Sequence, residues 1–245
     1  MSVQVRKQSG GNGKFFGLLA LVAIAGGAFI AYRAANKPAA APPVMPVPGD
    51  TVAARAAQGW SLGRDDAPVV VEEFADFECP SCGRFATLAE PDLRKAYVET
   101  GKVKFVFYDF PLVNAHRNTI PAHNAAACAG EQGKFWPMHD ALLERQEEWN
   151  GFVTDDPRKP IAGYAQSIGL DMAKWNACMD ASTFDARIKG NYALGMTRQV
   201  NGTPTFFIDG RLHTGNPSYD ELARAIDAAL EAKAAASRPI PAATP

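Results

Sequence analysis

Residues 69–82 read VVVEEFADFECPSC, an apolar run that leads directly into a Cys-x-x-Cys motif. Three consecutive valines followed by a phenylalanine indicate a strand that is covered on both faces. Pro80 favours the first position of a helix, because its missing N–H would have no partner there. Cys79 is therefore expected at a helix N-terminus, where free N–H groups and the helix dipole stabilise a thiolate. Because Cys82 lies three residues on, within disulfide reach on the same helical face, we interpret this stretch as a redox site.

Two other interpretations of the Cys-x-x-Cys motif are weaker. An inert pair of core cysteines does not account for the order of strand, motif and helix. A structural zinc site needs four ligands, and the chain has neither a second such motif nor a closely spaced histidine pair. We therefore predict no metal site.

Two motifs together resemble a known family. Cys79-Pro80-Ser81-Cys82 after a buried strand, with Gly202-Thr203-Pro204-Thr205 later in the chain, is similar to the DsbA-like thiol–disulfide oxidoreductases. The likeness extends over residues 60–232 and is greatest to the branch with a helical insertion that is tethered to the bacterial envelope. It implies an α/β thioredoxin fold interrupted by an α-helical domain, and no cofactor is expected beside the two cysteines.

The resemblance also implies roles for residues around the cysteines. Glu73, six residues before Cys79, corresponds to a carboxyl group that assists proton transfer for the buried Cys82, and desolvation should raise its pKa. The alternative is a solvated strand residue, since Glu72 must face the other way. Pro80 and Ser81, which lie between the cysteines, would tune the reduction potential of the cysteine pair. The family prototype has histidine in place of Ser81, and serine brings no positive charge to the nucleophile.

The later motif is expected to face the cysteines. In proteins that look like this one, Thr203-Pro204 forms a cis-proline loop opposite the Cys-x-x-Cys motif. The Thr203 backbone would then pair with an extended substrate segment as an added strand. An ordinary trans proline at the start of a strand is the alternative.

The remaining two cysteines, Cys128 and Cys178, lie far apart on separate helices of the expected insertion. In an oxidising compartment spare thiols tend to be bonded where geometry allows. We predict a second, structural disulfide between them, with two buried free cysteines as the alternative. A formal net charge of −1 gives no reason to expect nucleic acid as a partner.

The N-terminal region carries a membrane signal. Residues 15–32 contain no charged side chain, and eighteen residues at helical rise span about 27 Å, close to the hydrocarbon thickness of a bilayer. Basic residues before this segment favour an N-inside orientation. A cleaved signal peptide is the alternative, because small residues follow. Either interpretation exports the rest of the chain to the bacterial envelope, on the periplasmic side.

Composition and pattern divide the chain into consecutive parts. The expected parts are a cytoplasmic N-terminus (1–14), a transmembrane signal-anchor (15–33), an Ala/Pro-rich linker (34–58), a thioredoxin-fold domain (59–109 and 200–233), a helical insertion (110–199) and a disordered tail (234–245).

The sequence thus predicts an envelope enzyme that forms disulfides in exported proteins by exchange through Cys79 and Cys82. Its expected partners are cysteine-containing exported proteins and a membrane redox partner, quinone-linked if the enzyme is an oxidase. Three alternatives stay open: a reductase or isomerase of the same fold, a non-enzymatic membrane-tethered module that binds unfolded chains, and a metal-binding envelope protein.

Overall fold

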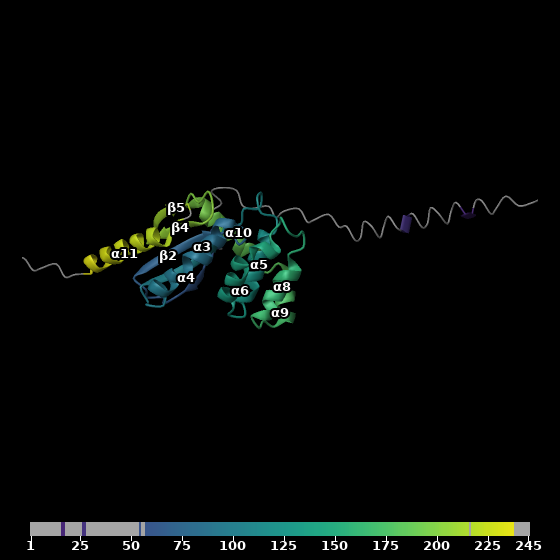
Figure 1. Ribbon diagram of the computed structural model, residues 1–245, viewed down its shortest axis with the longest axis horizontal. Helices are drawn as coiled ribbons and strands as arrows, with labels where there is room; N and C mark the ends of the chain where they lie inside the picture. The colour runs from purple at the N-terminus through teal and green to yellow at the C-terminus, as the bar shows by residue number, and fades with distance from the viewer. Residues whose placement is uncertain (1–15, 18–25, 28–53, 55–56, 216, 238–245) are drawn as a thin grey trace, which may run out of the picture. The chain divides into compact units, whose positions relative to one another are not determined.

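The computed structural model describes residues 16–17, 26–27, 54, 57–215 and 217–237. Its centre is a five-stranded sheet in the order β1-β3-β2-β4-β5 (Figure 1). The strands are β1 (Trp60–Leu62), β2 (Val69–Ala75), β3 (Val103–Asp109), β4 (Thr205–Ile208) and β5 (Arg211–Thr214). β2 and β3 run parallel, whereas the other neighbouring pairs are antiparallel. β2 and β3 are joined through helical segments, and β4 and β5 form a hairpin that turns at Asp209-Gly210.

β2 is the middle strand, and this position explains its apolar sequence. It pairs along its full length with β3 and with β4 on the other side. Val69 and Val71 are fully buried on one face, together with Phe105 of β3. Phe74 faces the opposite side and packs with Phe207. Because both faces are covered, the strand can hold a run of apolar residues rather than an alternating pattern.

Four helical segments pack on the face that carries Val69 and Val71. They are α3 (Pro80–Leu88), α4 (Glu90–Leu93), the π-helical segment η1 (Arg94–Val98) and α11 (Tyr219–Ala236). The helix is interrupted near Pro91: α3 ends at Leu88, and Pro91 lies in the first turn of α4. Pro91 cannot donate a backbone hydrogen bond, so a helix that passes this point must break or bend.

The chain between β3 and β4 forms the helical insertion. Its helices are α5 (Thr119–Gly130), α6 (Phe135–Glu144), α7 (Gln146–Trp149), α8 (Arg158–Ser167), α9 (Met172–Ala181) and α10 (Asp185–Thr197). Figure 1 shows α5, α6, α8 and α9 gathered beside the sheet, and α6 contacts α3. Asp171 caps α9, because its carboxylate accepts hydrogen bonds from the backbone N–H groups of Ala173 and Lys174. The expected α/β fold with a helical insertion is therefore confirmed.

β1 is not among the elements that the sequence predicts, and its three residues pair with β3. The predicted tail at 234–245 begins too early, because α11 continues through Ala236, and residues 238–245 lie outside the described part of the chain. The predicted span 15–33 also lies outside it, apart from residues 16–17 and 26–27. Among the residues that are described, no helix is long and apolar enough to cross a bilayer.

Candidate active site

The Cys-x-x-Cys motif opens helix α3 as the sequence predicts. Cys79 is the N-cap residue and Pro80 begins the helix. The Cys79 backbone N–H donates to the Asp76 carbonyl at 3.0 Å, which closes the turn between strand and helix. Both cysteines are free thiols, and their exposure is unequal: Cys79 is 7% exposed and Cys82 only 1%. The outer sulfur can therefore meet another protein, whereas the inner one cannot.

The environment of Cys79 favours the thiolate. A hydrogen bond from the Cys82 thiol lowers the pKa of Cys79 to about 5, against the opposing effect of burial. Hydrogen bonding from Thr203 and from the backbone of Cys82 and Ser81 lowers this pKa further. The backbone donors belong to the first turn of α3, where N–H groups have no partner within the helix. A thiol with a pKa near 5 is almost fully ionised at neutral pH.

Cys82 has the opposite character. Burial raises the pKa of Cys82 well above its ordinary value, and its hydrogen bond to Cys79 and the charges of Cys79 and Glu73 raise it further. A thiolate at Cys82 would be surrounded by apolar groups and by negative charge. The site therefore holds one ionised and one protonated sulfur, and the proton of Cys82 must leave before that sulfur can react.

Glu73 lies on β2, on the face toward α3, and is only 2% exposed. Burial raises the pKa of Glu73 well above its ordinary value, and the nearby charge of Glu90 adds to this effect. Glu72 points to the other face, where its carboxylate forms a bidentate pair with Arg198 at 2.7 and 2.8 Å. The alternation expected for a strand thus separates the two glutamates, and Glu73 is the buried one.

The Thr203-Pro204 peptide bond is cis, and this loop lies against Cys79. The Cys79 sulfur is 3.4 Å from the Thr203 carbonyl oxygen. The Thr203 hydroxyl is buried and has no hydrogen-bond partner among the described atoms, which leaves it free to donate to a thiolate. Residues 124 positions apart in sequence therefore form one site.

Ser81 has a partner that sequence reasoning did not anticipate. The Arg84 guanidinium, one helical turn along α3, donates to the Ser81 hydroxyl at 2.8 Å. This pair is exposed to solvent. Positive charge next to Pro80-Ser81, the two residues between the cysteines, therefore comes from a side chain outside the motif.

Gln146, a residue of the insertion that the sequence does not single out, binds the active-site turn. Its side-chain amide donates to the Phe77 carbonyl at 2.7 Å and to the Cys79 carbonyl at 2.9 Å. A Cβ atom at Gly83 would lie 2.5 Å from the Gln146 side chain, so glycine is required for this approach. Gln146 thus links the insertion to the redox motif through two partly buried hydrogen bonds.

A second unpredicted group is the buried carboxylate of Asp76, just before the motif. It accepts hydrogen bonds from the Leu112 N–H at 2.7 Å, from His116 Nδ1 at 2.8 Å and from the Thr119 hydroxyl at 2.5 Å. Burial opposes its ionisation, but the hydrogen bond from His116 and the charges of His116 and His123 keep the pKa of Asp76 below its ordinary value. Nothing in the spacing of these histidines in the sequence indicates this contact.

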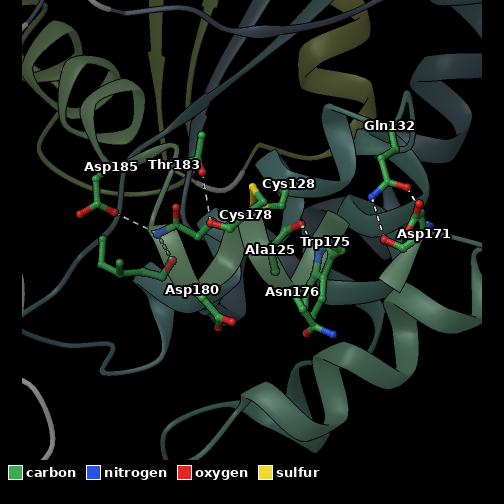
Figure 2. The surroundings of a disulfide bond; sticks show 12 residues. Ala125, Cys128, Gln132, Asp171, Trp175, Asn176, Cys178, Asp180, Thr183 and Asp185 are labelled. Carbon is green, nitrogen blue, oxygen red and sulfur yellow. Dashed lines mark hydrogen bonds between the residues drawn. A yellow bond between two sulfur atoms is a disulfide. The ribbon is translucent and has the colours of Figure 1, made fainter. Parts of the chain in front are cut away.

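The structure joins Cys128 of α5 to Cys178 of α9 in a disulfide (Figure 2). Their Cα atoms lie 5.9 Å apart. The Trp175 indole beside them donates to the Ala125 carbonyl at 3.2 Å, so α5 and α9 are joined by a hydrogen bond as well. This sulfur pair lies within the insertion, on helices that do not carry the redox motif.

Comparison with known proteins agrees with this geometry. Residues 56–228 match the sequence profile of a family described as Thioredoxin. The chain belongs to the thioredoxin family. Disulfide bond formation protein D of Bacillus subtilis is a relative with 28% identity, and the match covers 70% of this chain and 77% of that protein. The crystal structure of oxidised BdbD from Bacillus subtilis has 26% identity and a TM-score of 0.61, and the match covers 70% and 92% of the two chains.

Two further proteins that resemble this chain differ in how much of their own length the match covers. Wolbachia pipientis α-DsbA1 has a TM-score of 0.67 with 20% identity over 80% of this chain and 98% of its own, so the two share the fold. The Na(+)/H(+) antiporter NhaA 3 of Salinispora tropica is 36% identical over 69% of this chain. The chain spans about a quarter (24%) of the length of that relative. The resemblance to DsbA-like thiol–disulfide oxidoreductases drawn from the two motifs is confirmed.

Proposed function

We propose that this protein oxidises pairs of thiols in exported proteins. In the disulfide form, a substrate thiolate attacks the Cys79 sulfur, the Cys79–Cys82 bond breaks and its electron pair passes to Cys82, which takes up a proton. A second substrate thiolate then attacks the substrate sulfur of the mixed disulfide and releases Cys79 as a thiolate. The products are a substrate disulfide and the reduced enzyme.

The observation that carries this direction is the difference between the two thiols. A Cys79 pKa of about 5, against an ordinary thiol value of 9.0, stabilises the reduced enzyme at pH 7. Only the part of the shift below pH 7 counts there, which is about two pH units or roughly 3 kcal/mol. For a two-electron couple this raises the reduction potential by about 60 mV. Stabilising the reduced form makes the disulfide a stronger oxidant.

Substrate binding and location complete the proposal. An extended substrate segment would pair with the Thr203 backbone, next to the slightly exposed sulfur of Cys79. The cell envelope is supported by the sequence of residues 15–33 and by relatives named for disulfide bond formation. A membrane protein that passes electrons to a quinone would return the enzyme to its disulfide form.

A glutathione redox titration of the full chain tests the direction. Alkylation and mass analysis follow the free thiols. Cys128 and Cys178 serve as an internal reference, because their bonded sulfurs are not alkylated. A potential near −120 mV, as in DsbA, supports an oxidase, whereas one near −270 mV, as in thioredoxin, identifies a reductase. The absence of any reversible couple at Cys79 and Cys82 would leave the non-enzymatic binding module as the better description.

A trapping experiment tests the nucleophile. Cys82→Ser removes the resolving thiol. Cys79 of this variant, first converted to a mixed disulfide with glutathione, should exchange with a reduced, unfolded substrate protein that carries one cysteine, release glutathione and hold the substrate in a stable mixed disulfide. Cys79→Ser is the matched control and should trap nothing. Equal trapping by both variants would contradict the assignment of Cys79 as the attacking sulfur.

A further inference from the structure

A group of buried ionisable side chains lies behind the redox motif. One oxygen each from Glu73 and Glu90 and one ring nitrogen of His139 lie within 4.8 Å of one another. The three residues are 2%, 1% and 0% exposed. Glu73 Oε2 and His139 Nε2 are both buried and have no hydrogen-bond partner in the described part of the chain. An acid and a base without partners, in one buried group, are suited to exchange a proton.

One nitrogen of His139 is paired with a carboxyl group that reaches solvent. His139 Nδ1 lies 2.8 Å from Asp140 Oδ1 and 3.4 Å from the Arg94 guanidinium, and the Asp140 side chain is 43% exposed. A carboxylate only accepts hydrogen bonds and is the nearer partner, so Nδ1 carries the proton and Nε2 is left as the basic nitrogen. Asp140 lines a cavity of about 250 Å³ at the surface, together with Glu90, Arg94 and Glu144. His139 thus connects a fully buried carboxyl group to one that contacts solvent.

The surrounding charges favour a proton over a metal ion in this group. The Arg94 guanidinium lies 2.6 Å from Glu90 and 3.0 Å from Asp140. It therefore already pairs with Glu90, one of the two carboxylates that a divalent cation would need, and its own charge would repel the cation. Glu90, Asp140 and Arg94 together carry a net charge of −1. One proton shared between Glu73 and His139 makes that pair neutral, so the group of five residues keeps the charge of −1.

We propose that His139 and Asp140 form the route by which the proton of Cys82 leaves through Glu73 to solvent. This inference rests on the proposed function, and it concerns the step in which the enzyme regains its disulfide. The Cys79 thiolate first attacks an oxidant disulfide, which forms a mixed disulfide and releases one oxidant thiolate. Cys82 then transfers its proton to Glu73, and its sulfur attacks Cys79.

The proton of Cys82 then passes to solvent, and the oxidant leaves with an electron pair. Glu73 passes the proton to His139 Nε2, while the Nδ1 proton moves to Asp140 and from there to water. The bond between Cys79 and the oxidant sulfur breaks, and its electron pair leaves with the oxidant as a second thiolate. The fixed charges of Glu90 and Arg94 hold the geometry, and neither gains nor loses a proton. His139 and Asp140 do not touch the reacting sulfurs, so they act through Glu73.

Rapid-quench oxidation of the reduced full-length protein by oxidised glutathione separates the two steps. Acid quenching, alkylation and mass analysis resolve the reduced enzyme, the glutathione mixed disulfide and the final disulfide. In Asp140→Asn the first step should keep its wild-type rate, because it uses only Cys79. The second step should slow at least tenfold at pH 7, within the range of general acid–base effects, so that the mixed disulfide accumulates.

The pH profile excludes a merely structural effect. In Asp140→Asn the second step should recover as pH rises, because hydroxide then removes the proton without the relay. His139→Gln should act in the same way, and Glu144→Gln, which alters the same cavity without contacting His139, should behave as wild type. Thermal unfolding of each variant checks that it folds.

Two results would overturn the relay. One is a wild-type second step in both Asp140→Asn and His139→Gln, and the other is equal slowing by Glu144→Gln. Failure of the first step in the wild-type protein is a different result, because it would contradict the proposed function itself.

Discussion

The Thr203 hydroxyl provides a direct test of how the site controls Cys79. Thr203→Val keeps the β-branched shape and removes a buried hydroxyl that has no hydrogen-bond partner among the described atoms and that can stabilise the Cys79 thiolate. A hydrogen bond to a charged group contributes about 1.5–3 kcal/mol, which corresponds to about 1–2 pKa units. The pKa of Cys79, about 5 in the wild-type protein, should therefore rise to roughly 6–7. The thiolate fraction at pH 7 should fall from about 99% to about 50–90%.

The same change should weaken the enzyme as an oxidant. Destabilising the thiolate destabilises the reduced form, and at pH 7 the reduction potential should fall by about 30–50 mV. Thiolate absorbance at 240 nm, followed from pH 3 to pH 9, measures the pKa, and the glutathione titration measures the potential. Both quantities should move together, because one hydrogen bond controls both.

Thr203→Ser is the matched control, since it keeps the hydroxyl and changes only the methyl group. Its Cys79 pKa should stay near the wild-type value. An unchanged pKa in Thr203→Val would refute the reasoning, because the hydroxyl would then contribute nothing to the thiolate. Equal shifts in the valine and serine variants would point to packing of the loop instead.

Three further predictions concern stability. Gln146→Ala removes two hydrogen bonds to carbonyls of the active-site turn, so the melting temperature should fall by about 4–8 °C in calorimetry; an unchanged value would contradict this. Replacing Cys128 and Cys178 together by alanine opens a loop with a sequence separation of 50, so the free energy of unfolding in urea should fall by about 4 kcal/mol. A fall below 1 kcal/mol would mean that this disulfide contributes little to stability. The hydrogen bond to Asp76 raises the pKa of His116. The stabilisation of the folded protein by protonated His116 is therefore fully present below about pH 6.5 and is lost as pH rises through the raised pKa. His116→Asn should therefore lower the free energy of unfolding more at pH 5.5 than at pH 9, and a pH-independent loss would contradict that sign.

The redox motif could be predicted from sequence because its determinants are local. A buried strand, a proline at the first helical position and two cysteines three residues apart define the positions of both sulfurs within one turn. β1 escaped prediction because three residues are too few to display a periodic pattern. Its residue Trp60 nevertheless stacks on Phe135 of the insertion, with ring centroids 4.5 Å apart.

Other parts of the site depend on packing between distant segments. The Thr203 loop was placed by family resemblance, since nothing in a separation of 124 residues brings it to Cys79. Neither the contacts of Gln146 with the turn nor those of His139 with Glu90 could be predicted. They arise where α6 and α7 of the insertion meet α3 and α4, and a buried histidine on an apolar helix face has the same sequence pattern as an ordinary core residue.

The second disulfide has the same unequal burial as the redox pair. Cys178 is 7% exposed, like Cys79, whereas Cys128 is 1% exposed, like Cys82. An oxidant that meets the folded protein can therefore reach the sulfur of Cys178 and not that of Cys128. Formation of this bond by thiol–disulfide exchange would begin at Cys178 of α9 and be completed by Cys128 of α5, which displaces the oxidant from the buried side. The insertion thus holds a second pair of sulfurs, one outer and one inner, that can close in the same order as the first.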